Sequence, residues 1–276
     1  NLGYSAAAIS DHGNLAASVE FVEEMKKKNL KSILGIELYL SNQHSTIKTK
    51  ENASLDHLVV LAKNLQGWKD MLKLTKNSNK EENFYRKPRL SREQLVEFVH
   101  GNFISFSGHP GSQLANCLFI DQKLCYRAKT VAEAYGYLFP DALERAVKLA
   151  REYEAIFGKG NFFIEIQRNA KYEPEQKKET ELNNKLIALA RKNEVKIVAT
   201  GDCHYIKPDD NEAQDILVCI GTGRTVGDTN RLDMRSHGLW LRSPEEMAEL
   251  FADIPEAVEN TEVVAEMCNL EIPTNQ

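Results

Sequence analysis

The amino-acid sequence predicts an α/β fold, and it favours a barrel over an open sheet. Short apolar runs typical of buried strands alternate with amphipathic helical patterns, as in a largely parallel sheet covered by helices. Titratable side chains stand where several of these strands meet a loop. Catalytic groups of parallel barrels lie at such strand ends, so this second observation favours the barrel.

Six segments carry a short apolar or β-branched run bounded by glycine or polar residues, which is the pattern of a buried strand. The expected strands are 6–9, 32–40, 58–61, 102–106, 162–166 and 196–200. Five segments repeat apolar residues on one helical face or begin with a capping residue. The expected helices are 15–29, 65–77, 91–99, 141–157 and 174–193. Ser91 and Gln94 have the spacing of a capping box, and Gly158 follows the fourth helix as a stop signal.

The pattern changes near residue 206, and we expect a domain boundary there. Residues 1–206 are expected to form the barrel domain, with a polar loop at 41–53 and an irregular insertion near 115–140. Beyond the boundary no further buried strand is clear, and helices are expected at 209–220, 244–251 and 255–268. Residues 207–276 are therefore expected to be a mainly helical extension.

The composition is that of an ordinary globular protein, because 42% of the residues are hydrophobic and 27% are charged. No apolar run approaches the roughly 20 residues that cross a bilayer, and no signal-peptide pattern opens the chain, so no membrane contact is expected. The net charge of −5 gives no support to DNA binding by the whole surface, so contact with nucleic acid is expected to be confined or indirect. Five cysteines without a CxxC pair argue against a disulfide framework and indicate a reducing, cytoplasmic location.

Six histidine and carboxylate side chains are expected at or beside strand ends. They are His12, Glu37, His57, His109, Asp202 and His204. Imidazole and carboxylate ligands together suit zinc, manganese or iron better than magnesium or calcium alone. Two ions about 3.5–4 Å apart would clamp the attacking and leaving oxygens of a phosphoester hydrolysis.

A structural interpretation of these residues stays open at this point. A single histidine at a strand end is more often a capping or surface residue than a ligand, and Asp11 and Asp202 are also typical turn residues. His44, His100 and His237 lie in predicted loops or at a helix end and are expected at the surface. Only the recurrence of histidine, glutamate and aspartate at successive strand ends favours a metal site. Residue types and spacing alone leave the two interpretations evenly balanced.

Longer segments resemble the motifs of one family. Residues 10–14 (SDHGN), 35–37 (GIE), 105–111 (SFSGHPG) and 199–205 (ATGDCHY) are similar to motifs of the PHP (polymerase and histidinol phosphatase) domains. Residues 56–64 (DHLVVLAKN), 84–89 (FYRKPR), 212–224 and 243–251 are similar to segments of its replicase subset, the alpha subunits of bacterial DNA polymerase III. Small PHP phosphatases would not be expected to carry the last two. The similar segments span nearly the whole chain in the right order.

The resemblance implies a PHP-type distorted (β/α)7 barrel, truncated at its N-terminus and followed by a helical extension toward a polymerase palm outside this chain. It puts the family's metal ligands on His12, Glu37, His57, His109, Asp202 and His204. Four of these are also expected to be catalytic: His12, His109, Asp202 and His204. Asp11 is expected to orient the loop of His12. The implied cofactor is a cluster of Zn²⁺, with Mn²⁺ or Fe²⁺ as alternatives, and Mg²⁺ would serve the absent polymerase site.

Two departures from the family pattern bear on activity. Many replicase domains have cysteine where this chain has His109, and His109-Pro110 is similar to the pair in active phosphoesterases. This raises the expectation of 3′–5′ exonuclease activity. The family's opening H-x-H motif and the ligand that follows it would lie upstream of Asn1. Part of the expected ligand shell is therefore missing, and the activity of this piece is expected to be impaired.

The function implied by the resemblance is DNA replication. The intact protein would be a DNA-directed DNA polymerase, a nucleotidyltransferase whose partners are DNA, the sliding clamp, other replisome subunits and a proofreading exonuclease. Two alternatives remain. One is a free-standing phosphatase that acts on a small phosphorylated metabolite, and the other is a non-catalytic scaffold whose metal site only stabilises the fold or docks a proofreading partner.

Overall fold

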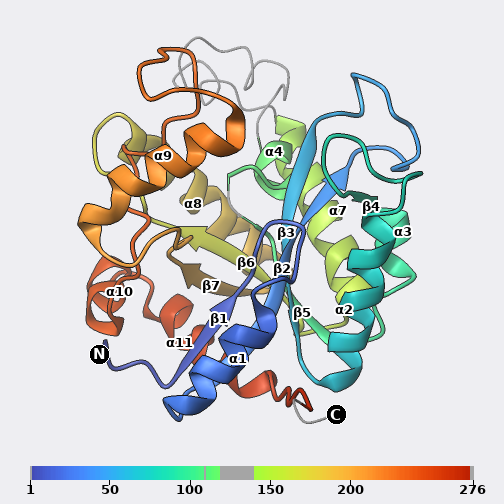
Figure 1. The fold of residues 1–276 in the computed structure, drawn as a ribbon, viewed down its shortest axis with the longest axis horizontal. Coiled ribbons are helices and arrows are strands. Elements are labelled where there is room, and N and C mark those ends of the chain that lie inside the picture. Colours follow the sequence, from blue (N-terminus) through green and yellow to red (C-terminus); the bar gives the residue numbers. More distant parts are fainter. Residues whose placement is uncertain (1, 109, 119–139, 274–276) are drawn as a thin grey trace.

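The computed structural model describes residues 2–108, 110–118 and 140–273, and in these residues one mixed sheet is flanked by helices (Figure 1). The strands are β1 (Ala6–Ile9), β2 (Lys31–Ser41), β3 (Leu55–Ala62), β4 (Leu90–Ser91), β5 (Phe103–Phe106), β6 (Phe162–Gln167) and β7 (Lys196–Thr200). They lie in the order β1-β2-β3-β5-β6-β7, and the short β4 pairs with β2. The sheet curls into a half-barrel, which confirms the predicted distorted barrel class.

The direction of β3 departs from the parallel arrangement that the sequence predicts. β3 runs antiparallel to both β2 and β5, whereas β1–β2, β5–β6 and β6–β7 are parallel pairs. The connection is the physical reason: residues 42–54 contain no helix to carry the chain across the sheet, so the chain folds back beside β2. This reversal puts the first residues of β3 at the edge where the parallel strands end.

The predicted helices are all present, with ends that differ by a few residues. They are α1 (Ser18–Lys27), α2 (Leu65–Ser78), α3 (Arg92–Val96), α7 (Pro140–Phe157), α8 (Glu175–Asn193), α9 (Asn211–Thr222), α10 (Pro244–Leu250) and α11 (Pro255–Met267). The capping box of Ser91 and Gln94 is confirmed, with both of its hydrogen bonds formed. Three short elements were not predicted: β4, α4 (Gln113–Cys117) and the 3₁₀ turn η1 (Pro208–Asp210).

The structure does not test two of the predictions about how the chain is organised. The insertion near 115–140 lies mostly outside the described residues, and the boundary near 206 stays a prediction. Among the described residues, none of the helices combines the length and the apolar character needed to span a membrane.

Side chains alternate along the strands between an outer face covered by helices and a concave inner face. On β6, Phe162, Ile164 and Ile166 belong to the main core, against which α7 and α8 pack. The intervening Phe163 belongs to a second core on the concave side. That second core consists of Ile33, Leu61, Ile104, Phe106, Phe163, Val198, Val264 and Cys268. Val264 lies in α11 and Cys268 directly follows it, so α11 packs into the concave side of the sheet.

A cavity of about 550 Å³ lies between β1, β7 and α11. Among the described residues, β1 pairs only with β2 and β7 only with β6, so the half-barrel is open between these two strands. Ala6 to Ala8 of β1 and Val198 to Thr200 of β7 both line it. The two unpaired strand edges thus border one cavity.

The side chain of Arg89 joins the polar loop 42–53 to the segment before β4. It is fully buried, and its guanidinium donates hydrogen bonds to the carbonyl oxygens of Ser45, Ile47, Asn52 and Asn83. The planar fork of arginine suits several acceptors at once. Arg89 is therefore the anchor of both segments.

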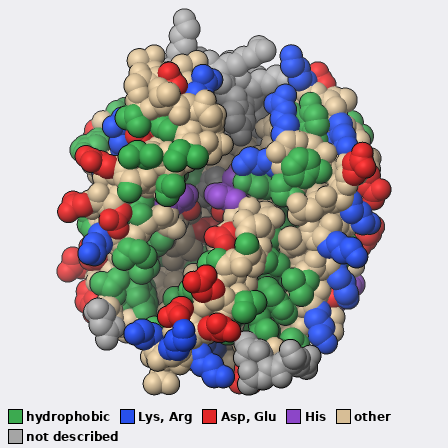
Figure 2. Space-filling view, in the orientation of Figure 1, with side chains coloured by type: hydrophobic (Ala, Val, Ile, Leu, Met, Phe, Trp, Pro, Cys, Tyr) green, Lys and Arg blue, Asp and Glu red, His purple; other side chains and the backbone are tan. Residues whose placement is uncertain are grey.

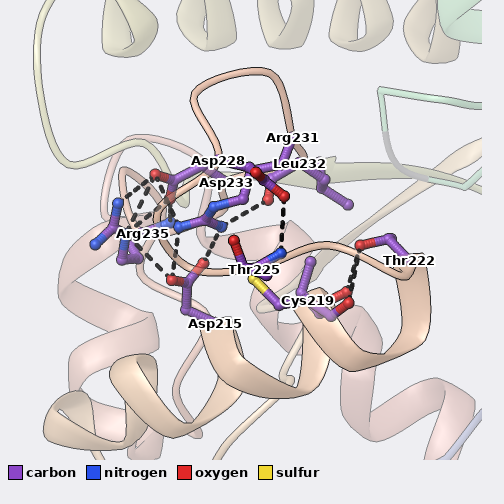
Figure 3. A network of polar contacts seen from close by, with 10 residues as sticks. Asp215, Cys219, Thr222, Thr225, Asp228, Arg231, Leu232, Asp233 and Arg235 are labelled. Carbon is purple, nitrogen blue, oxygen red and sulfur yellow. Dashed lines mark hydrogen bonds and ion pairs between the residues drawn. The ribbon is translucent and has the colours of Figure 1, made fainter.

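An ion-pair network fixes the loop after α9 to that helix (Figure 3). Arg231 donates to both carboxylate oxygens of Asp215, at 2.6 and 2.8 Å, and both side chains are buried. Arg235 pairs with Asp233 at 2.6 Å, and hydrogen bonds from Arg235 hold the pKa of Asp233 down at about 2. The two-pronged geometry fixes the course of the loop as well as its distance from α9.

Replacing Arg89 with methionine is expected to destabilise the protein by on the order of 3 kcal/mol, because the carbonyl oxygens that it serves would lose their donor in a buried place. Chemical denaturation followed by circular dichroism measures the difference. Arg86→Met, at a nearby exposed position, is the matched control and is expected to change stability by less than ~0.5 kcal/mol. Equal stability of R89M and the unchanged protein would contradict the anchoring role.

Candidate metal centre

Three of the predicted ligands meet on the side of the sheet toward which the parallel strands run. His12 lies in the loop after β1, Glu37 lies within β2, and His57 lies near the start of β3. Glu37 donates its backbone N–H to the carbonyl of Asp11 at 3.0 Å, and Gly13 donates to the carbonyl of Glu37 at 2.9 Å. These bonds extend the β1–β2 pairing and hold His12 beside Glu37. The reversed direction of β3 brings His57 to the same side.

The side chains of His12, Glu37 and His57 form a compact cluster. One ligand atom from each lies within 4.8 Å of the others. His12 Nδ1 is 3.4 Å from Glu37 Oε2, and His57 Nδ1 hydrogen-bonds with Glu37 Oε1. The Glu37 side chain is only 8% exposed, whereas that of His12 is 46% exposed, so the cluster is open to solvent on the His12 side. Two imidazoles and a carboxylate are a donor set that fits a zinc, manganese or iron ion.

His204 approaches this cluster from the loop after β7, and Asp202 lies in the same loop. The rings of His204 and His12 have centroids 6.3 Å apart. His204 Nδ1 is 2.7 Å from the carbonyl oxygen of Asp202, and a carbonyl only accepts, so Nδ1 carries the proton. The Nε2 lone pair is then free for a metal ion. The backbone N–H of His204 donates to the carbonyl of Leu239 at 2.8 Å, which fixes the loop.

His109, the remaining predicted ligand, lies outside the described residues. Its described neighbours pack against the site: His57 donates its backbone N–H to the carbonyl of Gly111 at 3.4 Å. Gly108 has a φ of +89°, and a Cβ there would lie 2.8 Å from the carbonyl oxygen of His57. Only glycine allows this close approach. The role of His109 stays a prediction.

Burial controls the charge state of His12. Desolvation lowers the pKa of His12, the Glu37 carboxylate acts in the opposite direction, and His57, His204 and Lys87 lower it further. The net shift is downward, which favours the neutral imidazole at pH 7. A neutral imidazole is the form that binds a metal ion.

Two further residues at the site were not predicted from the sequence. Tyr39 follows Glu37 on the same face of β2, and its ring stacks on that of His12 with centroids 5.9 Å apart. Lys87 donates a hydrogen bond to the hydroxyl of Tyr39 at 2.8 Å. Tyr39 could have been predicted from its spacing, because side chains two residues apart on a strand lie on the same face and Glu37 is two residues before it. No local signal marks Lys87, because its contact depends on a partner far away in the sequence.

A buried carboxylate on β6 was also missed. Glu165 is 4% exposed and accepts hydrogen bonds from Thr200 and from Gln167. It lies two residues after Phe163, at the point where the concave face changes from apolar to polar. A charged residue inside an otherwise apolar strand was the signal that could have found it.

The remaining histidines were predicted to lie at the surface, and the structure confirms this for two of the three. His44 and His100 are exposed, as predicted. The prediction for His237 is wrong, because His237 is half-buried: its backbone forms a bridge with Ala170 and its carbonyl accepts a hydrogen bond from Tyr205. Burial lowers its pKa. These are long-range contacts that local sequence does not encode. The predicted role of Asp11 as an orienting residue stays a prediction.

Histidine side chains gather at the centre of one face of the molecule (Figure 2). They line a hollow in which acidic side chains lie below them and basic side chains beside them. The site is therefore accessible to a ligand from solvent.

The chain is similar to known proteins over most of its length. The family model of the PHP domain matches residues 1–169. The chain belongs to the PHP domain family. DNA polymerase III subunit alpha of Helicobacter pylori is 33% identical over 98% of this chain, and that of Borreliella burgdorferi is 34% identical over 96%. The alpha subunit of Thermus aquaticus is 32% identical over 97%. This PHP chain spans about a fifth of the length of these relatives, 20 to 21%.

Among solved structures, there is a weak likeness to a protein of Bifidobacterium adolescentis provisionally named a metal-dependent phosphoesterase. It has a TM-score of 0.36 and 14% identity, and the match covers 73% of this chain and 78% of that one. A likeness of this size supports no conclusion about the chemistry of the PHP site.

Glu37→Gln is expected to lower the pKa of His12 further, because the carboxylate that opposes the effect of burial would be gone. In the metal-free protein, the imidazole would then take up its proton at a lower pH than before. Nuclear magnetic resonance titration of the His12 ring measures the shift. Glu93→Gln, at an exposed position on α3, is the matched control and should leave the titration of His12 in place. An upward shift in E37Q would show that Glu37 does not act on His12 in this way.

Proposed function

We propose that this chain is the PHP part of a bacterial DNA polymerase III alpha subunit and that it carries a metal-dependent phosphoesterase site. The cluster of His12, Glu37 and His57, from the loop after β1 and from β2 and β3, is the observation that carries the proposal. The similarity to alpha subunits over nearly the whole chain supports the larger protein as its context.

His12, Glu37 and His57 would hold the first metal ion, and Asp202, His204 and His109 would complete the ligand set. Zn²⁺, with Mn²⁺ or Fe²⁺ as alternatives, would act as a Lewis acid on a phosphoryl oxygen. Glu37 would neutralise positive charge and keep both imidazoles in place, and His204 would offer Nε2. In this proposal His12, His109, Asp202 and His204 touch the substrate or its attacking water.

The cavity between β1 and β7 supports the expected upstream H-x-H segment. In the part of the chain that the structure describes, each strand borders the cavity with an edge that pairs with no other strand. Both strands run in the same direction, so one further strand would pair with both and close the barrel. Its end would then lie between His12 and His204. Ligands from that segment would complete a cluster of more than one ion.

The reaction that we propose is 3′–5′ hydrolysis of a DNA strand. A phosphodiester is the ester that a polymerase subunit meets, whereas a small phosphorylated metabolite is the substrate of the alternative, a free-standing phosphatase. The polymerase reaction itself would use Mg²⁺ and carboxylates outside this chain. A purely structural metal site remains the third candidate, and the activity measurement below separates it from the other two.

The partners that we propose are DNA, the sliding clamp, other replisome subunits and a proofreading exonuclease, in the cytoplasm. Three large apolar side chains of α9 are exposed, namely Ile216, Leu217 and Ile220. An exposed apolar group of this kind favours contact with further protein. We propose that the remainder of the longer polymerase chain covers it.

Metal content tests the ligand assignment in the full-length protein. His57→Ala and Glu37→Ala are each expected to weaken metal binding by at least ~10-fold, because each removes a ligand atom of the cluster. His100→Ala, an exposed histidine outside the site, is the matched control and should retain the metal. Mass spectrometry of the metal after dialysis gives the stoichiometry. Retention of metal by both cluster variants would refute the assignment.

Hydrolysis of a 3′-labelled oligonucleotide and of p-nitrophenyl phosphate tests the reaction. Asp202→Ala is expected to reduce oligonucleotide hydrolysis on the order of 100-fold. Asp209→Ala, on an exposed turn nearby, is the control and should keep the activity. Activity on the small ester alone would favour the phosphatase. Bound metal without any hydrolysis in the unchanged protein would favour the structural site.

A further inference from the structure

A lysine ammonium stands at the edge of the candidate metal centre. Lys87 Nζ donates to Tyr39 Oη at 2.8 Å and lies 4.5 Å from the centre of the Tyr39 ring. That ring stacks on His12 with an interplanar angle of 15° and meets His57 edge-on, with centroids 5.1 Å apart. Only one aromatic ring therefore separates the ammonium from the imidazoles of the cluster.

The side chain of Lys87 is exposed, and no carboxylate among the described residues forms an ion pair with it. A cation in this place would repel a metal ion bound to His12 and His57, so its position is unfavourable unless an anion lies between them.

The backbone around Lys87 is held in a defined shape. Arg86 has a φ of +65°, a strained value for a residue with a side chain, and Tyr85 donates its N–H to the carbonyl of Lys87 at 3.3 Å. Pro88, the residue after Lys87, packs so closely on the His12 loop that a Cβ on Gly13 would lie 2.9 Å from Pro88 Cγ. Strain of this kind persists only where the surrounding structure maintains it. The turn therefore keeps Lys87 directed at the site.

We propose that Lys87 is a substrate-binding residue that holds the phosphoryl group of the ester at the metal centre, and that Tyr39 positions it. This inference rests on the proposed phosphoesterase function. The ammonium has three N–H donors. One is used by Tyr39, and two remain for non-bridging phosphate oxygens, where negative charge gathers during displacement. Tyr39 extends from β2 to the ammonium of Lys87, and its hydroxyl fixes the direction in which the two remaining donors point.

Binding of inorganic phosphate to the metal-loaded, full-length protein tests the inference. Titration calorimetry of Lys87→Met is expected to give a dissociation constant for phosphate at least ~10-fold higher than that of the unchanged protein, with equal metal content. Lys87→Arg should restore much of the affinity because it keeps the positive charge. Tyr39→Phe should weaken binding less than K87M, because the ammonium remains but is less well fixed. Lys80→Met, an exposed lysine of the same segment, is the matched control with no expected effect.

The possible outcomes separate this inference from the function on which it rests. Equal phosphate affinity of K87M and the unchanged protein, both with bound metal, would overturn the inference and leave the phosphoesterase proposal standing. Loss of metal from K87M would also overturn it, because Lys87 would then be a structural support of the site. Absence of metal binding by the unchanged protein would refute the proposed function itself, and the inference with it.

Discussion

The burial of the Glu37 carboxylate is the constraint on which the site depends. A charged group that is almost hidden from water is stable only when positive charge or hydrogen-bond donors compensate for it. Here the compensation comes from two imidazoles, His12 and His57, which belong to different parts of the chain. The carboxylate thus links the loop after β1 to the start of β3 across the long strand β2. The same arrangement leaves a donor set suited to a divalent cation, which would complete the balance of charge.

One sheet both forms the core and carries the site, because its concave face is apolar at one end of the strands and polar at the other. On β2 this face runs from Ile33 through Gly35 to Glu37 and Tyr39. On β6 it runs from Phe163 to Glu165. The apolar half packs against α11, while the polar half meets the loops after β1 and β7. The alternation of strand side chains makes this division possible without any additional element.

The loops around the site are held by a few specific contacts rather than by secondary structure. Arg89 secures the segment that leads to Lys87 through the carbonyl of Asn83, and the carbonyl of Leu239 accepts the backbone N–H of His204. Asp202 and Arg86, in two of these loops, both adopt left-handed backbone conformations, with φ of +48° and +65°. Strained residues of this type concentrate at functional sites, where surrounding contacts fix a geometry that the local sequence does not favour.

The sequence by itself determined the order and type of the longer elements, the capping of α3 by Ser91, and the presence of histidines and carboxylates at or beside strand ends. These features depend on neighbours within a few residues, so local patterns suffice to predict them. Tertiary structure alone decided the reversal of β3, which is the reason that His57 reaches the cluster. It also decided the pairing of Lys87 with Tyr39 and the partial burial of His237. Each of these depends on contacts between segments far apart in the chain, which no local pattern records.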